Sequence, residues 1–167
     1  MVKRKKSEVK RVLVSACLLG IECNYKGKSK KSRRVLNLLK RRDVILIPIC
    51  PEQLGGLPTP REAAEIVGGD GFDVLRGKAR VFTKSGEDVT HYFIRGAKLV
   101  GKIAKLLKVK YAILKQRSPS CGCGQIYDGS FTGKVIEGYG VTAALLKKMG
   151  IRVISDEDFE DNYLEGC

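Results

Sequence analysis

The stretch Val12-Leu-Val-Ser-Ala-Cys17 is an apolar run that ends in a cysteine, at the point where a strand should give way to a loop. The pattern returns in Ile45-Leu-Ile-Pro-Ile-Cys50-Pro51 and in Ala112-Ile-Leu-Lys-Gln-Arg-Ser-Pro-Ser-Cys121-Gly122. We predict that all three runs are strands of one parallel sheet. The loops at the carboxyl ends of parallel strands gather at one edge, where α/β folds bind their ligands. The three thiols are therefore expected to meet there, although they are far apart in the sequence.

Helices are expected between these strands, because apolar residues recur at three- and four-residue steps. The expected strands cover about 12–16, 44–49, 111–114 and 151–154, and the expected helices about 30–41, 62–67, 90–107 and 141–149. Residues 72–83 indicate a hairpin or a short excursion, and two more strands flank Asp128-Gly129. The predicted fold class is α/β: a single domain with a mainly parallel sheet flanked by helices, in Rossmann-like layers, and a site at the carboxyl ends of the strands.

For two of these elements the sequence also predicts which residues are buried. The run Val44–Ile49 is fully apolar, which is typical of a parallel strand that is buried on both faces. The basic helix expected at 30–41 would place Val35, Leu38 and Leu39 on one buried face.

At 167 residues the chain is long enough for one domain with a real hydrophobic core. We assign residues 11–158 to the α/β domain, residues 1–10 to a basic N-terminal tail and residues 159–167 to an acidic C-terminal tail. No stretch approaches the roughly 18 uninterrupted apolar residues of a membrane span, and no apolar segment follows the basic start as in a secretory signal. We therefore expect a cytoplasmic protein with no membrane partner. In a reducing cytosol, six cysteines favour metal binding or catalysis over disulfides.

The net charge of +14 is concentrated at one end of the chain. Residues 1–42 carry fifteen Lys and Arg side chains against two acidic ones, whereas the remainder is nearly balanced. Such a one-sided basic region favours phosphate-bearing partners. Lys28, Lys30 and Arg33 follow the Cys17 loop directly, so they are candidate contacts for a substrate phosphate. For residues 1–11, a solvated tail is the alternative explanation.

Thiols are the main chemistry-bearing side chains. The chain has one histidine, His91, and lacks a Walker A motif, a Gly-x-Gly-x-x-Gly turn after a strand, and the Cys-x-x-Cys pairs of structural zinc sites. Iron–sulfur clusters accept thiolates from distant loops, and a Cys-Pro step such as Cys50-Pro51 recurs among their ligands. Each cysteine taken alone is better explained as a small buried hydrophobe. Together, Cys17, Cys50 and Cys121 favour a metal or iron–sulfur site.

The other cysteines are weaker candidates. Cys23 lies six residues after Cys17 and is either an additional ligand or a bystander. Cys123 would point to the opposite side from Cys121 in an extended loop. Cys167 is terminal, where disorder is common.

Two polar residues accompany the ligand candidates. Glu52 follows Cys50 by two residues, close enough to act as a general base on a substrate bound there. Its alternative role is a helix cap or an ion pair with Arg61. Ser118 precedes Cys121 by three residues in a turn stiffened by proline, where its hydroxyl either faces the site or forms the turn itself.

Longer motifs surround these residues. They are Ser15-Ala-Cys-Leu-Leu-Gly20 with Tyr25 and Gly27, Cys50-Pro-Glu-Gln-Leu-Gly-Gly-Leu-Pro-Thr-Pro-Arg61, Gly86-Glu-Asp-Val-Thr90, Ser118-Pro-Ser-Cys-Gly122, Tyr127-Asp-Gly-Ser-Phe131 and Gly140-Val-Thr-Ala-Ala-Leu-Leu146. With them the chain resembles the thiouracil desulfurase family over about residues 11–158. The resemblance implies a [4Fe-4S] cluster held by only three cysteines, Cys17, Cys50 and Cys121, so that one iron is not bound by cysteine. It also implies catalytic roles for Glu52 and Ser118.

This resemblance implies a non-redox desulfuration of a thiolated pyrimidine. An iron without a cysteine ligand can bind a thiocarbonyl through its sulfur and act as a Lewis acid. We expect Glu52 to take a proton from water, the hydroxide to add to the ring carbon and sulfide to be released, while Ser118 positions the ring or relays a proton. The substrate is thiouracil, or 4-thiouridine as a nucleotide or within tRNA, and the basic stretch favours a nucleotide.

Two other functions stay open at this point. A redox or electron-transfer iron–sulfur protein would need a fourth cysteine ligand, which Cys23 or Cys123 could supply. A zinc-stabilised RNA-binding module would use the basic half of the chain, but the aromatic residues are scattered rather than interleaved with it.

Overall fold

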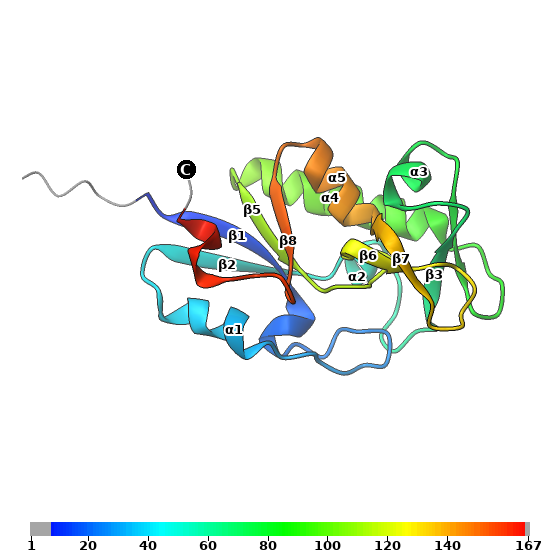
Figure 1. Cartoon of the computed structure of the whole chain (residues 1–167), viewed down its shortest axis with the longest axis horizontal. Helices are drawn as coiled ribbons and strands as arrows, with labels where there is room; N and C mark the ends of the chain where they lie inside the picture. Colours follow the sequence, from blue (N-terminus) through cyan, green and yellow to red (C-terminus); the bar gives the residue numbers. More distant parts are fainter. Residues whose placement is uncertain (1–7, 166–167) are drawn as a thin grey trace, which may run out of the picture.

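The computed structural model describes residues 8–165. Its centre is a four-stranded sheet with the order β2-β1-β5-β8, in which all neighbouring strands are parallel (Figure 1). The strands are β1 (Lys10–Ser15), β2 (Val44–Ile49), β5 (Tyr111–Leu114) and β8 (Arg152–Ser155). The predicted α/β class is confirmed, as is the parallel pairing of the three runs that precede the cysteines.

Helices cover both faces of this sheet. One face carries α4 (Thr90–Leu106) and α5 (Val141–Lys148), whose side chains join Leu13 and Leu114 of the sheet in one hydrophobic cluster. Burying a leucine of this kind completely stabilises the fold by roughly 1.5–3 kcal/mol.

The other face of the sheet carries only short helical turns. They are α1 (Arg33–Leu36) and the 3-10 helices η1 (Ala16–Leu19), η2 (Asn37–Lys40) and η3 (Asp161–Leu164). The basic helix expected over 30–41 is therefore shorter than predicted and changes to 3-10 geometry at its end. Val35 and Leu38 are buried as predicted, whereas Leu39 is 62% exposed because the last turn rotates it towards solvent.

Two antiparallel hairpins lie beyond the carboxyl ends of the parallel strands (Figure 1). They are β3 (Ala64–Val67) with β4 (Arg80–Thr83), and β6 (Cys123–Tyr127) with β7 (Val135–Tyr139). The helix α3 (Gly71–Leu75) connects β3 to β4 and begins at a reciprocal capping box formed by Asp70 and Asp73. The two strands predicted around Asp128-Gly129 are confirmed.

The helix predicted for 62–67 is wrong, because this segment contains β3. Ile66 and Val67 are β-branched, which favours strands, and Ile66 pairs with Val81 across the hairpin. A six-residue segment with four apolar residues fits either period, so the pairing with β4 decided the outcome.

Burial of β2 on both faces is also wrong. The strand lies at one edge of the sheet, and Ile45 is 49% exposed. The edge position accounts for Pro48, which has no N–H to donate to a second neighbour.

The two segments predicted as tails differ in what the structure describes. Residues 1–7 of the basic segment and Cys167 lie outside the described residues. At the acidic end, Phe159 and Leu164 are fully buried in the hydrophobic cluster beneath the sheet. Residues 159–165 therefore pack onto the domain rather than extending from it as a free tail. Within residues 8–165, no helix combines the length and the apolar character needed to cross a membrane.

Candidate active site

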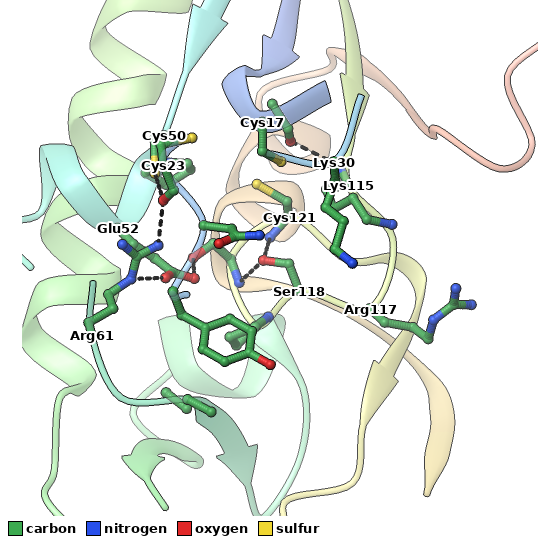
Figure 2. A pocket seen from close by; sticks show the side chains of 18 of the residues that line it. Cys17, Cys23, Lys30, Cys50, Glu52, Arg61, Lys115, Arg117, Ser118 and Cys121 are labelled. Carbon is green, nitrogen blue, oxygen red and sulfur yellow. Dashed lines mark hydrogen bonds and ion pairs between the residues drawn. The ribbon is translucent and has the colours of Figure 1, made fainter. Parts of the chain in front are cut away.

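Four cysteines line one cavity of about 540 Å³ at the carboxyl edge of the sheet: Cys17, Cys23, Cys50 and Cys121 (Figure 2). Cys17 lies in η1 directly after β1, Cys50 follows β2, and Cys121 follows the loop after β5. The structure thus brings together the three thiols that follow the parallel strands, with Cys23 beside them.

The donor set of this cavity fits an iron–sulfur cluster. Among residues 8–165, no three Cys, His, Asp or Glu side chains lie close enough together to hold a single metal ion. A [4Fe-4S] cluster is larger than one ion and takes its thiolates from separate loops. Thiols that come from three strand-end loops and surround a cavity provide such a set.

Contacts between thiols, together with burial, favour the protonated forms of Cys23, Cys50 and Cys121, because they raise the pKa of each of these thiols. The Cys50 thiol donates to the carbonyl oxygen of Cys23 at 3.6 Å. Contact with the Cys23 thiol and burial raise the pKa of Cys50, and contact with the Cys17 thiol raises the pKa of Cys23. Burial also raises the pKa of Cys121. Since iron binds thiolates, cluster binding releases these protons.

Glu52 reaches the same cavity from α2 (Pro51–Leu54), and both of its oxygens have partners (Figure 2). Its Oε2 forms an ion pair with Nε of Arg61 at 2.6 Å, and its Oε1 accepts a hydrogen bond from Ser120 at 3.0 Å. Arg61 also donates to the carbonyl oxygen of Cys23 at 3.1 Å. The ion pair that the sequence offered as an alternative role is therefore present, and it joins Glu52 to the thiol loops.

Two glycines hold α2 directly against α4. A Cβ atom at Gly96 would come within 2.0 Å of the carbonyl oxygen of Pro51, and one at Gly55 within 2.1 Å of the carbonyl oxygen of Tyr92. Any larger residue would force α2 away from α4. This close approach fixes the position of both Cys50 and Glu52.

Ser118 forms the turn that presents Cys121. Its Oγ accepts hydrogen bonds from the backbone N–H groups of Ser120 and Cys121, at 3.2 and 3.1 Å. The turn-forming role is therefore present, and Ser118 also lines the cavity. Burial raises the pKa of the Cys121 thiol, and the nearby hydroxyls of Ser15 and Ser118 act against this rise.

The positive charge at the cavity comes from several loops. Of the three basic residues suggested by the sequence, Lys30 lines the cavity, whereas Lys28 and Arg33 are exposed residues outside its lining. Lys30 is tied to the site by its backbone N–H, which donates to the carbonyl oxygen of Cys17 at 2.9 Å. Lys115 and Arg117 also line the cavity, from the loop after β5.

Sequence reasoning missed these two basic residues, although they follow β5 just as Cys17 follows β1. It also assigned no role to Glu65, Tyr127 or Phe131, which line the cavity from the two hairpins. Tyr127 and Phe131 belong to a motif quoted above, which was the available signal. Glu65 had none, because its segment was predicted as a helix.

Cys123 is not among the residues that line the cavity. It begins β6 and is 9% exposed, and burial raises its pKa to about 11. Gln116 holds its backbone on both sides, since Gln116 Nε2 donates to the Cys123 carbonyl and Gln116 Oε1 accepts from the Cys123 N–H. Cys121 and Cys123 therefore differ in access to the cavity although only one residue separates them.

Comparison with known proteins agrees with this arrangement. Residues 12–158 match the family model described as 2-thiouracil desulfurase. The uncharacterized protein YbbK of Bacillus subtilis (strain 168) is 51% identical over 150 residues, which cover 90% of this chain and 98% of that protein. The solved structure of a [4Fe-4S]-dependent thiouracil desulfidase, TudS, is 41% identical, with a TM-score of 0.75 and coverage of 93% of this chain and 94% of that one. This chain belongs to the 2-thiouracil desulfurase family.

Proposed function

We propose that this protein is a [4Fe-4S]-dependent desulfidase that replaces the sulfur of a thiolated pyrimidine with oxygen from water. The observation that carries the proposal is the meeting of Cys17, Cys50 and Cys121 with Glu52 in one cavity. The activity named for TudS supports the same reaction for a chain that is 41% identical to it.

Cys17, Cys50 and Cys121 would hold the cluster, since each follows a parallel strand and faces the cavity. A cluster held by these three thiolates would supply an iron without a protein ligand, which would act as a Lewis acid towards the sulfur of a thiocarbonyl. Ser118 orients Cys121 through the turn, since its Oγ accepts from the Cys121 N–H, and the hydroxyls of Ser15 and Ser118 act against the rise in the pKa of the Cys121 thiol that burial causes.

The protein's part in the chemistry is carried by Glu52. Its carboxylate takes a proton from a water molecule, and the oxygen of that water forms a bond to the ring carbon as the carbon–sulfur bond breaks. Arg61 and Ser120 fix the two carboxylate oxygens, so the general base has one orientation. Water supplies the oxygen and sulfide leaves with the electron pair of the broken bond, so no oxidant or reductant is consumed.

The basic residues of the cavity support a nucleotide as substrate. Lys30, Lys115 and Arg117 line the cavity, and a free base has no anionic group to pair with them. Lys115 and Arg117 form ion pairs with Asp156 and Glu157, whereas among residues 8–165 the Lys30 ammonium has no ion-pair partner. A 5′-phosphate, or the backbone of tRNA, would pair with it. Of these two, a mononucleotide fits a cavity of about 540 Å³.

The test is anaerobic purification followed by a sulfide-release assay. The proposal predicts a brown protein that contains iron and acid-labile sulfide and that converts 4-thiouracil, 2-thiouracil or their nucleotides to the oxygen forms without an added reductant. A colourless protein, or a brown protein that releases no sulfide from any of these compounds, would contradict it.

A further inference from the structure

A buried carboxylate lies on the wall of the cavity formed by the hairpins. Glu65 belongs to β3, is only 8% exposed and lines the cavity. Its Oε2 accepts hydrogen bonds from the backbone N–H groups of Gly129 and Phe131, at 2.9 and 3.1 Å. Glu65 therefore fixes the turn between β6 and β7 against β3.

This turn is rigid and positions an aromatic ring. Asp128 Oδ1 accepts hydrogen bonds from the backbone N–H and the hydroxyl of Ser130. A Cβ atom at Gly129 would come within 2.6 Å of the carbonyl oxygen of Ile66, so the turn touches the backbone of β3. Phe131 adopts a positive φ of 57°, a strained conformation for a residue with a bulky side chain. The two hydrogen bonds to Glu65 offset this strain, and Phe131 lines the cavity.

The second oxygen of Glu65 is not used by the protein. Within residues 8–165, Oε1 has no hydrogen-bond partner, and no Lys or Arg side chain forms an ion pair with Glu65. Among the described residues, Thr142 Oγ1 is the one fully buried side-chain nitrogen or oxygen atom without a partner, so Glu65 Oε1 is open to the cavity and can accept from a donor there. A ligand in the cavity that presents an N–H group would supply such a donor.

We propose that Glu65 binds a ring N–H of the pyrimidine through Oε1, while the ring of Phe131 packs against the face of the heterocycle. Pyrimidine bases with a carbonyl or thiocarbonyl carry a ring N–H beside that group, and a carboxylate accepts such a donor strongly. This inference rests on the proposed function, since it names the part of the substrate that the site recognises. Glu65 is thus a specificity-determining residue rather than only a support for the turn.

The experiment uses the cluster-loaded wild-type protein and uracil, the oxygen analogue, whose binding requires no turnover. Dissociation constants are measured by calorimetry for uracil, 1-methyluracil and 3-methyluracil. Methylation of one ring nitrogen should weaken binding about 10- to 100-fold, because a hydrogen bond to a charged acceptor is lost. Equal affinity for all three compounds would overturn the inference.

Replacement of Glu65 by glutamine separates its proposed role in substrate binding from its role in supporting the β6–β7 turn. In Glu65→Gln the amide oxygen can still accept the hydrogen bonds from the turn. The amide NH₂ group then takes the place of Oε1 and faces the ring N–H, so two hydrogen-bond donors oppose each other. We expect uracil affinity to fall at least tenfold and the effect of methylation to shrink to less than threefold, with the melting temperature nearly unchanged. Glu137→Gln, an exposed residue of β7, is the matched control and should bind all three compounds as the wild type does. A Glu65→Gln variant with the full wild-type discrimination would refute the inference.

A crystal structure of the loaded wild-type protein with uracil decides the case if Glu65→Gln fails to fold. Oε1 of Glu65 should lie within hydrogen-bond distance of a ring nitrogen, and a water-filled gap between them would contradict the inference. Sulfide release is scored separately. A protein that desulfurates thiouracil but ignores ring methylation disproves the role of Glu65 alone, whereas a protein that releases no sulfide disproves the proposed function.

Discussion

The two walls of the cavity are built by different parts of the fold. The thiol wall comes from the ends of the parallel strands β1, β2 and β5, whereas the hairpin wall, which contains Glu65, Tyr127 and Phe131, comes from β3–β4 and β6–β7. Parallel strands place their ends at one edge by topology alone, so the thiols meet although they are far apart in the sequence. The hairpin wall depends on individual contacts, such as the hydrogen bonds from the β6–β7 turn to Glu65. The thiol wall therefore suits cofactor binding, and the hairpin wall suits substrate recognition.

The largest effect is expected when one cysteine of the thiol wall is replaced. In Cys50→Ala one of the three proposed cluster ligands is lost, so iron and acid-labile sulfide should fall to a small fraction of the wild-type content and activity should vanish. Cys123→Ala is the control, because this buried cysteine is outside the cavity lining, and it should retain both iron and activity. Iron content and the visible absorbance of the cluster are measured for both variants. Full iron content in Cys50→Ala would remove this residue from the ligand set.

The next effect separates chemistry from cluster binding. Glu52→Gln keeps an oxygen for the Arg61 guanidinium but removes the base, so kcat should drop about 10²- to 10⁴-fold at unchanged iron content. The side chains of both residues are largely buried, and an unpaired Arg61 would be strongly destabilising, so the melting temperature is measured alongside. Wild-type kcat in a fully loaded and folded Glu52→Gln variant would show that Glu52 only supports the loop through Arg61.

A smaller effect is expected for Lys30, one of the basic residues that line the cavity. In Lys30→Ala, the KM for 4-thiouridine monophosphate should rise about three- to fivefold, because exposed ion pairs contribute up to about 1 kcal/mol. The KM for the free base should not change, and the difference should shrink at high salt. Lys98→Ala, an exposed residue of α4, is the control. An equal change for base and nucleotide would argue against a phosphate contact at Lys30.

The smallest effect concerns the support of the hairpin wall and depends on pH. Asp88 accepts hydrogen bonds from the hydroxyl and the N–H of Thr90 and pairs with Arg80 of β4, and these contacts lower the pKa of Asp88 to about 2. A carboxyl whose pKa is lowered by folding stabilises the fold above its unfolded pKa, and this contribution is lost as the pH falls through the folded value.

Asp88→Asn should therefore lower the free energy of unfolding by roughly 0.2–1 kcal/mol at neutral pH, because the amide still accepts from Thr90 but loses the exposed ion pair with Arg80. The difference from wild type should shrink as the pH falls below about 4 and disappear near pH 2. Urea denaturation across this pH range measures it, with Glu137→Gln as background. A difference that stays constant down to pH 2 would mean that the contacts of Asp88 do not depend on its charge.

The two walls also differ in how far the sequence predicts them. The apolar runs before Cys17, Cys50 and Cys121 are short and lead into loops with Gly or Pro nearby, so both the strands and the meeting of the thiols follow from the pattern. Glu52 and Ser118 were found because they lie within three residues of a thiol. The contacts that these residues make were harder to predict. The sequence suggested Arg61 as an ion-pair partner of Glu52, but it did not suggest Ser120.

The hairpin wall was largely beyond prediction, because its parts are joined only by tertiary contacts. Residues 62–67 fit a helix and a strand equally well, and pairing with β4 decides between them. Glu65 accepts a hydrogen bond from the N–H group of Gly129, which lies 64 residues later in the chain. No local sequence pattern indicates that contact. Likewise, the edge position of β2 depends on the order of the strands, which a single apolar run does not specify.

The most direct measurement is a crystal structure of the anaerobically loaded protein. It should show a four-iron cluster bonded to the sulfur atoms of Cys17, Cys50 and Cys121, with the fourth iron bonded to no protein atom and facing Glu52. A bond from the fourth iron to Cys23 would contradict this and favour an electron-transfer protein instead. A cavity that binds zinc, or no metal at all, would exclude the proposed reaction.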